Sequence, residues 1–522
     1  MTTYTVITFA PVQGFIEKSR KLRDLYGASQ ILSYLSYCLV KEAGKKHGLT
    51  VISPAIKEGE LSNDLIQGMP NRILIVGEIE RDHAFNLFRN TLYSAWEQLV
   101  QACKSWVEKK IPGSYDWNMS WKRWEMHAWE IFLGQDASIT DAMKDLETRK
   151  LRRGWTVPNW NGESSSLSGH DAIAYPKMDR EITSDNKRNQ GQERDEIAKF
   201  YESLADALEN SKSEDEPKFL DPSEKVSIPE LIKRLVTHYQ VTRDIPEFPR
   251  TKRFSELLRK EDDNEKAARG YWTGWFMGDG DKVGDHLKSL KDDQSVANFS
   301  QSLRTWGKGF QDGFHREHLG RVIYAGGDDF LGVMYGIRNG TEEQRQRKGT
   351  EAIDWLINLR QNWESGNLGI KVSVGFVWAG HSVPQRDVLQ HCREAEKLAK
   401  NLGRDRVTIR VVFNNGQYVQ WTTPWQYLEW LKDYRDRDGE SNWSHVYSDL
   451  AELKARHAIS PKGMKEADSR IALELFKLYF GEKNSSELSR KRSDITNKEE
   501  PRALIEWIEG MIQVGWQLCS NG

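Results

Sequence analysis

The sequence is poor in cysteine and has no long apolar run. Its 522 residues include 4 cysteines, which are far apart, at Cys38, Cys103, Cys392 and Cys519. None of them forms a Cys-x-x-Cys pair, so the spacing argues against a zinc ribbon or a disulfide framework and favours a reducing compartment. The sequence has no run of about 18 apolar residues and no basic N-terminal segment followed by an apolar one. We therefore expect a cytoplasmic protein without a membrane partner.

A strong charge of one sign is also missing. The chain has 75 lysines and arginines against 77 aspartates and glutamates, for a formal net charge of −2. Any contact with nucleic-acid phosphates must therefore come from local basic clusters. Three such clusters are present, at Lys18–Arg23, Arg149–Arg153 and Arg490–Arg492. Each is either a solvated helix face or a set of phosphate contacts, and the sequence leaves both open.

The length predicts roughly two to four domains. Residues 1–110 read as strand, helix, strand and helix, with the strands near 4–10 and 71–79. Residues 111–269 are rich in tryptophan and then in charge, and we expect an irregular and helical middle region. Three tryptophans there, Trp117, Trp121 and Trp124, share one face of a predicted helix. We interpret them as packing residues and not as a platform for stacking bases.

A second α+β unit is predicted over residues 270–415. Its elements follow the order β-α-β-β-α-β with one more helix and strand, which is the ferredoxin-like split βαβ arrangement. From residue 416 to residue 522 the pattern predicts helices only, forming a C-terminal helical bundle. The order of predicted elements in the first unit coarsely resembles that in the second, as expected of a degenerate relative. The predicted fold class is thus α+β, with two ferredoxin-like units.

The stretch YAGGDDF contains a Gly-Gly-Asp-Asp tetrapeptide between two predicted strands. Such a tetrapeptide taken alone is ordinary hairpin chemistry. However, the stretch GDGD at 278–281 ends the strand that neighbours this hairpin in a split βαβ sheet. We therefore expect Asp279 to lie beside Asp328 and Asp329, where clustered carboxylates are costly unless divalent cations neutralise them. A helix N-cap is the alternative role for Asp279.

Clustered carboxylates at a strand tip suit a metal–nucleotide site. Mg²⁺, or Mn²⁺ in its place, binds carboxylate oxygens, water and substrate phosphates, and two such ions can activate a ribose hydroxyl and stabilise a leaving pyrophosphate. We interpret Asp279, Asp328 and Asp329 as metal ligands and catalytic residues. Gly326 and Gly327 let the backbone approach a triphosphate. Lys400 ends a predicted helix, where it can reach the triphosphate, offset the helix dipole, or do both.

These motifs resemble known families. GDGD, YAGGDDF and AKNLGRDRV occur in the order found in the palm of GGDEF nucleotidyl cyclases, with Asp329 in place of the glutamate. The N-terminal stretch FAPVQGFIEKSRKLRDLYGASQILSYL and the later GMPNRILIVGE resemble the first palm in the large subunit of type III CRISPR effector complexes, the Cas-ten protein of the Cmr-two type. The resemblance covers residues 1–110 as first palm, 270–415 as second palm, and the C-terminal helical domain.

The resemblance implies an RNA-guided antiviral function. The second palm would join ATP molecules into cyclic oligoadenylate when target RNA pairs with the CRISPR RNA, using two Mg²⁺ or Mn²⁺ ions. Its partners would be other CRISPR effector subunits, CRISPR RNA and target RNA. ATP would lie between the palms, with Ser29 as a nucleotide contact. The alternatives are a stand-alone GGDEF-like synthase of cyclic dinucleotides and a scaffold that binds nucleotide without turnover.

Two features of the resembled family are not expected in this chain. Many members begin with an HD nuclease domain, whereas this sequence starts at the first palm. Its one His-Asp pair, His170–Asp171, lies in a loop of serine and glycine. The family also often has a cysteine-rich zinc element, whose place is taken here by ESSSLSG at 163–169, and serine does not ligate zinc. We therefore expect neither nuclease activity nor zinc.

Overall fold

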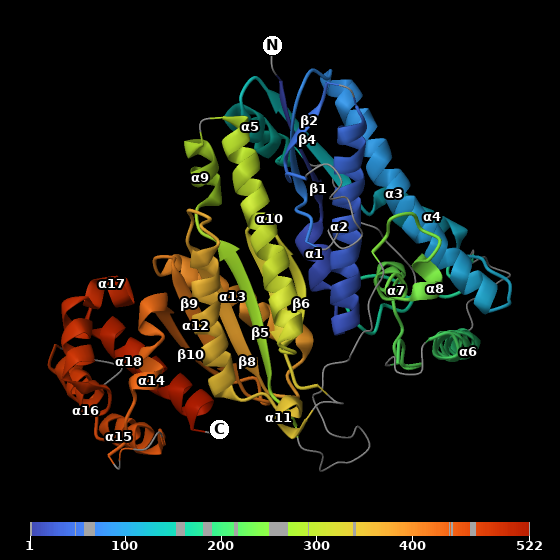
Figure 1. Cartoon of the computed structure of the whole chain (residues 1–522). Coiled ribbons are helices and arrows are strands. Elements are labelled where there is room, and N and C mark those ends of the chain that lie inside the picture. The colour runs from blue at the N-terminus through green and yellow to red at the C-terminus, as the bar shows by residue number, and fades with distance from the viewer. Residues whose placement is uncertain are drawn as a thin grey trace. The chain divides into compact units, whose positions relative to one another are not determined.

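A computed structural model of the chain shows two compact units, each built on its own β-sheet (Figure 1). The first unit comprises Met1–Glu256 and Leu290–Thr305, and the second comprises Leu257–Ser289 and Trp306–Gly522. The residues that the structure describes are 3–46, 48–56, 68–152, 162–180, 190–212, 218–249, 270–290, 292–337, 341–437, 439, 442–459, 466–498 and 500–520. Among the helices in these ranges, none is both long and apolar enough to cross a membrane.

The sheet of the first unit is antiparallel throughout, in the order β2-β3-β1-β4. Its strands are β1 (Tyr4–Ala10), β2 (Thr50–Ser53), β3 (Arg72–Val76) and β4 (Glu130–Asp136). This order is the ferredoxin-like one of the predicted fold class, although the sequence analysis had identified only β1 and β3. Helices α1 (Val12–Glu17), α2 (Leu22–Lys45) and α3 (Arg81–Lys110) connect the strands. Ile7, Ile73 and Leu133 are cross-strand neighbours in the core that these helices cover.

Strand β4 lies outside the segment predicted for the first palm, which ended at residue 110. It pairs with β1, and α5 (Ile139–Lys150) packs on it so closely that a Cβ atom at Gly134 would lie 2.3 Å from the carbonyl oxygen of Ala142. The prediction of an irregular segment here was wrong. A short strand that is buried on both faces reads as a nearly continuous apolar run, without the alternation that marks a half-exposed strand.

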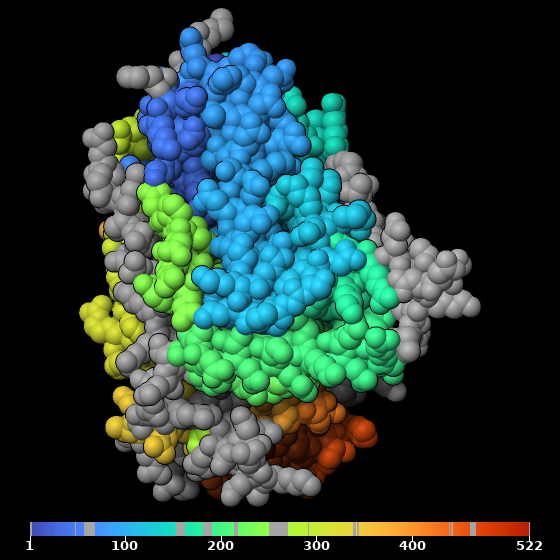
Figure 2. All heavy atoms as spheres, turned by 90° about the vertical axis from the view of Figure 1, so that its right-hand side faces the viewer, coloured from blue at the N-terminus to red at the C-terminus, as the bar shows by residue number. Residues whose placement is uncertain are grey.

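The middle region is helical, with α4 (Asn118–His127), α6 (Gln190–Glu209), α7 (Ile228–Leu235) and α8 (Tyr239–Thr242). The packing role of its tryptophans is confirmed. Trp117 and Trp121 are buried with ring centroids 5.4 Å apart, and the indole of Trp96 donates to the carbonyl of Trp124. Helix α3 lies beside α6, α7 and α8 on one face of this unit (Figure 2).

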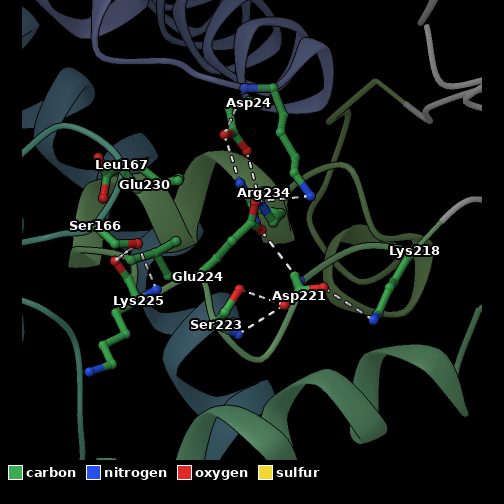
Figure 3. A network of polar contacts seen from close by, with 12 residues as sticks. Asp24, Ser166, Leu167, Lys218, Asp221, Ser223, Glu224, Lys225, Glu230 and Arg234 are labelled. Atoms are coloured by element: carbon green, nitrogen blue, oxygen red, sulfur yellow. Dashed lines mark hydrogen bonds and ion pairs between the residues drawn. The ribbon is translucent and has the colours of Figure 1, made fainter. Parts of the chain in front are cut away.

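A buried ion-pair network joins α2 to α7 (Figure 3). The guanidinium of Arg234 is fully buried and donates two hydrogen bonds of 2.8 Å to the carboxylate of Asp24. Its third contact is to Glu224 at 2.7 Å, and Lys21 lies 3.1 Å from the other oxygen of Glu224. Buried charges are tolerated only when they are paired in this way, so the network sets how the two helices pack.

The second unit has a six-stranded mixed sheet in the order β10-β9-β8-β5-β7-β6, in which β8 and β9 are parallel. Strands β5 (Thr273–Gly280), β6 (Gly320–Gly326), β7 (Asp329–Met334) and β8 (Val372–Ala379) form the split βαβ order that was predicted, and β9 (Arg406–Val412) is the added strand. The corresponding strands of both units therefore follow one spatial order. The helices of this part are α9 (Val283–Ser289), α11 (Glu342–Arg345), α12 (Gly349–Ser365) and α13 (Gln385–Asn401). Helix α10 (Asp293–Arg316) is divided between the units, and only its part from Trp306 onward belongs to the second.

The two faces of the second sheet are covered differently. On one face Phe276 packs against Phe310 of α10 and Trp355 of α12, with ring centroids 6.0 and 4.4 Å apart. On the other face α13 approaches the sheet so closely that a Cβ atom at Gly375 would lie 2.4 Å from the backbone nitrogen of Glu396. Glycine at 375 therefore lets α13 lie directly on β8.

The C-terminal region is helical as expected, but it begins after a further strand. Strand β10 (Tyr418–Pro424) pairs with β9 across a tight turn closed by a 2.8 Å hydrogen bond from Phe413 to Gln417. The prediction of helices only after residue 416 was wrong here, because Pro424 and the aromatics that follow it were read as a helix start. The remaining elements are the 3₁₀ turn η2 (Trp425–Tyr427), α14 (Trp430–Asp433), α15 (Ser444–Ala455), α16 (Glu466–Arg490), α17 (Arg492–Thr496) and α18 (Pro501–Cys519).

Candidate metal and nucleotide site

Strands β6 and β7 are joined by a two-residue turn, Gly327 and Asp328. Gly327 has a φ of +67°, which favours glycine, whereas Gly326 lies in the ladder opposite Asp329. The predicted turn therefore needs the freedom of glycine at position 327. Asp328 therefore lies at the tip of the turn, and Asp329 is the first residue of β7.

Three aspartates meet beside this turn. Asp279, near the end of β5, is the register partner of Asp329, and the amide of Gly280 donates a 3.0 Å hydrogen bond to the carbonyl of Asp328. One carboxylate oxygen from each of Asp279, Asp328 and Asp329 lies within 4.8 Å of the others, and no other such group is found in the described parts of the chain. The alternative role of Asp279 as a helix N-cap does not apply, because α9 begins only at Val283.

The electrostatics of this cluster favour a bound cation. The pKa of Asp329 is raised well above its usual value, first by the loss of water around its carboxylate and then by the negative charges of Asp328 and Asp279. A divalent cation would remove the repulsion between the carboxylates. Three carboxylate oxygens grouped in this way fit Mg²⁺ or Mn²⁺, which take oxygen ligands and complete their shells with water or phosphate.

Lys400 belongs to the same site. It lies in the last turn of α13, and its ammonium forms ion pairs with Asp279 and with Glu396. Burial disfavours the charged lysine, but the hydrogen bond to Asp279 and the ion pair with Glu396 outweigh it and raise the pKa of Lys400. Both predicted roles are therefore compatible with its position, since Lys400 ends a helix and also reaches the acidic cluster.

The sequence analysis assigned no role to Asp281, the second acid of GDGD. Its buried carboxylate accepts hydrogen bonds from the hydroxyl of Ser373, at 2.8 and 2.9 Å, and from the amide of Asp405, at 2.9 Å. Burial raises the pKa of Asp281, although these hydrogen bonds oppose the shift. Asp281 thus ties β5 to β8 and to the turn after α13, and no sequence spacing pointed to those partners.

Glu396 is a second residue that the sequence analysis missed. It lies one turn before Lys400 on α13, and 9% of the surface of the whole residue is exposed. Burial raises the pKa of its carboxyl group, the ion pair with Lys400 lowers it, and the charges of Asp279 and Asp281 raise it further. The spacing Glu-x-x-x-Lys on a helix was the available signal for this pair.

Ser29 and the basic clusters lie apart from these residues in the chain. Ser29 is a buried residue of α2 in the first unit, so its contact with a nucleotide stays a prediction. The first basic cluster is paired internally: Lys18 lies 3.1 Å from Asp171, and Arg23 stacks 3.6 Å above the ring of Phe219. In the other two clusters Arg149 pairs with Asp145 and Arg492 with Glu466, while Arg153 lies outside the described residues.

Two family models match the chain. Residues 272–408 match the second palm domain of Cas10/Cmr2, and residues 4–105 match the N-terminal domain of the CRISPR-associated protein Cmr2. The chain carries the two Cas10/Cmr2 domains. The Cas10/Cmr2 palm segment includes all three aspartates of the cluster and also Lys400.

One solved structure shares the fold of this chain at low identity, and others match it over most of its length with lower scores. A type III-B Cmr-beta complex in the apo state matches with a TM-score of 0.57 and 11% identity, over 98% of this chain and 82% of that one. The Csm1–Csm4 subcomplex of a type III-A CRISPR-Csm interference complex matches with a TM-score of 0.49 and 15% identity, over 99% and 70%. A Csm1–Csm4 cassette in complex with cA3 gives 0.49 and 14%, over the same shares of 99% and 70%. No curated protein matches the chain significantly.

Proposed function

We propose that the acidic cluster of the second unit is the active centre of a nucleotidyltransferase that converts ATP to cyclic oligoadenylate. The observation that carries the proposal is the meeting of Asp279, Asp328 and Asp329 within 4.8 Å, inside the segment that matches the Cas10/Cmr2 second palm. The chain would act as the large subunit of a type III CRISPR effector complex. Pairing of target RNA with the CRISPR RNA would activate it.

Each residue of the site has a part in this proposal. Asp279, Asp328 and Asp329 hold two Mg²⁺ or Mn²⁺ ions, which, when bound, activate a ribose hydroxyl and neutralise the leaving pyrophosphate. The ammonium of Lys400 binds an oxygen of the triphosphate, since its three donors allow contacts beyond its carboxylate partners. Gly326 and Gly327 keep side chains away from the nucleotide. Ser29 of the first palm contacts a second ATP.

The partners are part of the proposal as well. They are the other effector subunits, CRISPR RNA and target RNA, and the shared fold with a subunit of the Cmr-beta complex supports this assignment. The basic clusters give limited support to RNA contacts, because several of their cations pair with carboxylates of the same chain. We therefore assign no single lysine or arginine to RNA.

The test uses the assembled complex. Incubated with ATP, Mg²⁺ and cognate target RNA, it should release cyclic oligoadenylates that mass spectrometry detects. The double variant Asp328→Ala/Asp329→Ala should assemble normally and form no product. Asp312→Asn, a change at an exposed aspartate of α10, is the matched control and should leave product formation unchanged. Absence of product from the wild-type complex would overturn the proposal.

Two other results would favour the alternatives. Formation of a cyclic dinucleotide from GTP by the chain alone would favour a stand-alone cyclase. Calorimetry that shows binding of ATP and Mg²⁺ without conversion, even with target RNA present, would favour a nucleotide-binding scaffold.

A further inference from the structure

The ammonium of Lys400 lies between two carboxylates that have different surroundings. One is Asp279 of the metal cluster, and the other is Glu396, whose Oε1 lies 2.5 Å from the lysine nitrogen. The side chain of Glu396 is 12% exposed, compared with 29% for Asp279. Asp279 therefore remains accessible to a metal ion, whereas Glu396 is a largely buried anchor on the same helix as the lysine.

These two contacts respond differently to a metal ion. Lys400 binds Oδ2 of Asp279, one of the oxygens available to a divalent cation, so the lysine and the cation compete for this carboxylate. Glu396 is not one of the three clustered ligands, so its contact with the lysine persists when Asp279 binds metal. A lysine side chain has a flexible four-carbon stem. Without a second ionic partner its ammonium would be mobile and solvated.

We propose that Glu396 is a positioning residue for Lys400, which it holds beside the acidic cluster when Asp279 exchanges the ammonium for a divalent cation. The lysine then has a free donor directed toward a phosphate of the nucleotide. This inference rests on the proposed function, since it requires that the cluster binds metal and that Lys400 binds the nucleotide. Glu396 itself touches neither metal nor nucleotide.

The test is a double-mutant cycle on ATP affinity in the full-length protein with Mg²⁺. Glu396→Gln keeps the size of the side chain and removes its charge, and it should weaken ATP binding roughly tenfold, as the loss of one charge-assisted contact would. Lys400→Met should weaken ATP binding at least as much. In the Lys400→Met background, Glu396→Gln should change the affinity by less than about twofold, because the lysine that it holds is gone.

A control and a second measurement separate the outcomes. Glu394→Gln, two residues away on α13, removes a carboxylate that pairs with Arg410 at 2.7 Å, and it should leave ATP affinity unchanged. Equal losses of ATP affinity from Glu396→Gln in the presence and absence of Lys400 would indicate a structural role and overturn the inference. An unchanged ATP affinity of Glu396→Gln in the wild-type background would also overturn it. Mn²⁺ binding is measured in parallel by electron paramagnetic resonance. A wild-type protein that binds neither Mn²⁺ nor ATP would overturn the proposed function and this inference together.

Discussion

Asp279 and Asp329 stand directly opposite each other on β5 and β7, as the last register pair of that antiparallel ladder. Like charges in this position destabilise a sheet, and Asp328 adds a third negative charge at the tip of the hairpin. The metal-free protein is therefore less stable at this corner than a sheet with neutral residues would be. Such a conflict between stability and local charge is typical of functional sites.

Replacing Asp329 should accordingly stabilise the protein and abolish metal binding. Asp329→Asn removes one of the repelling charges, so in EDTA the free energy of unfolding should rise by up to about 1 kcal/mol in a urea titration. Mn²⁺ affinity should fall more than about 100-fold, because even groups outside the ligand shell cost 10–100-fold. Asp312→Asn should change neither quantity. A less stable Asp329→Asn protein in EDTA would contradict the repulsion argued here.

The pair of Asp24 and Arg234 should contribute strongly to stability only as a pair. Arg234→Met leaves the buried carboxylate of Asp24 without its partner, and the free energy of unfolding should fall by about 3–5 kcal/mol. The double change Asp24→Leu/Arg234→Met should cost less than the single one. Lys144→Ala, which breaks an exposed ion pair with Asp141, should leave the free energy of unfolding nearly unchanged. Chemical denaturation measures all three, and a double variant less stable than Arg234→Met would contradict this account.

His238 should make the first unit sensitive to acid. Burial between Trp106 and Phe219 lowers the pKa of His238 from 6.5 to about 4. Since the unfolded chain binds the proton first, stability is full above about pH 6.5 and falls as the pH drops toward 4, by about 3 kcal/mol in total. His238→Gln should flatten this part of the stability curve. Exposed His315→Gln is the control, and a His238→Gln curve parallel to the wild type would contradict the assignment.

Two glycines of α2 offer a matched test of helix packing. A Cβ atom at Gly27 would lie 1.9 Å from the carbonyl oxygen of Lys233 in α7, whereas a Cβ atom at Gly44 would meet nothing within 4 Å. Gly27→Ala should therefore lower the free energy of unfolding by about 2–3 kcal/mol, because backbone must move to make room. Gly44→Ala should leave it unchanged or raise it by up to about 1 kcal/mol. Equal effects of the two changes in thermal unfolding would refute the close contact.

The meeting of the three aspartates was predictable because it depends on strand order. GDGD ends one strand and GGDD turns the next hairpin, and the split βαβ topology makes those strands neighbours. The partners of Asp281 were not predictable in the same way, whereas the i,i+4 spacing of Glu396 and Lys400 was a signal that the sequence analysis did not use. Ser373 and Asp405 come close to Asp281 only after β8 and the turn following α13 are in place. Strands β2, β4 and β10 were missed because local pattern alone does not separate a short strand from a helix or an irregular segment.

The shared strand order of the two sheets allows their corresponding corners to be compared. The ladder between β1 and β3 ends on Thr8 opposite Arg72, at the corner where the second sheet has Asp279 opposite Asp329. The pair in the first sheet has no carboxylate and includes a cationic arginine, so of these two corners only that of the second sheet is acidic. The same corner of the fold therefore has neutral and cationic side chains in the first sheet and, in the function proposed above, the reactive chemistry in the second.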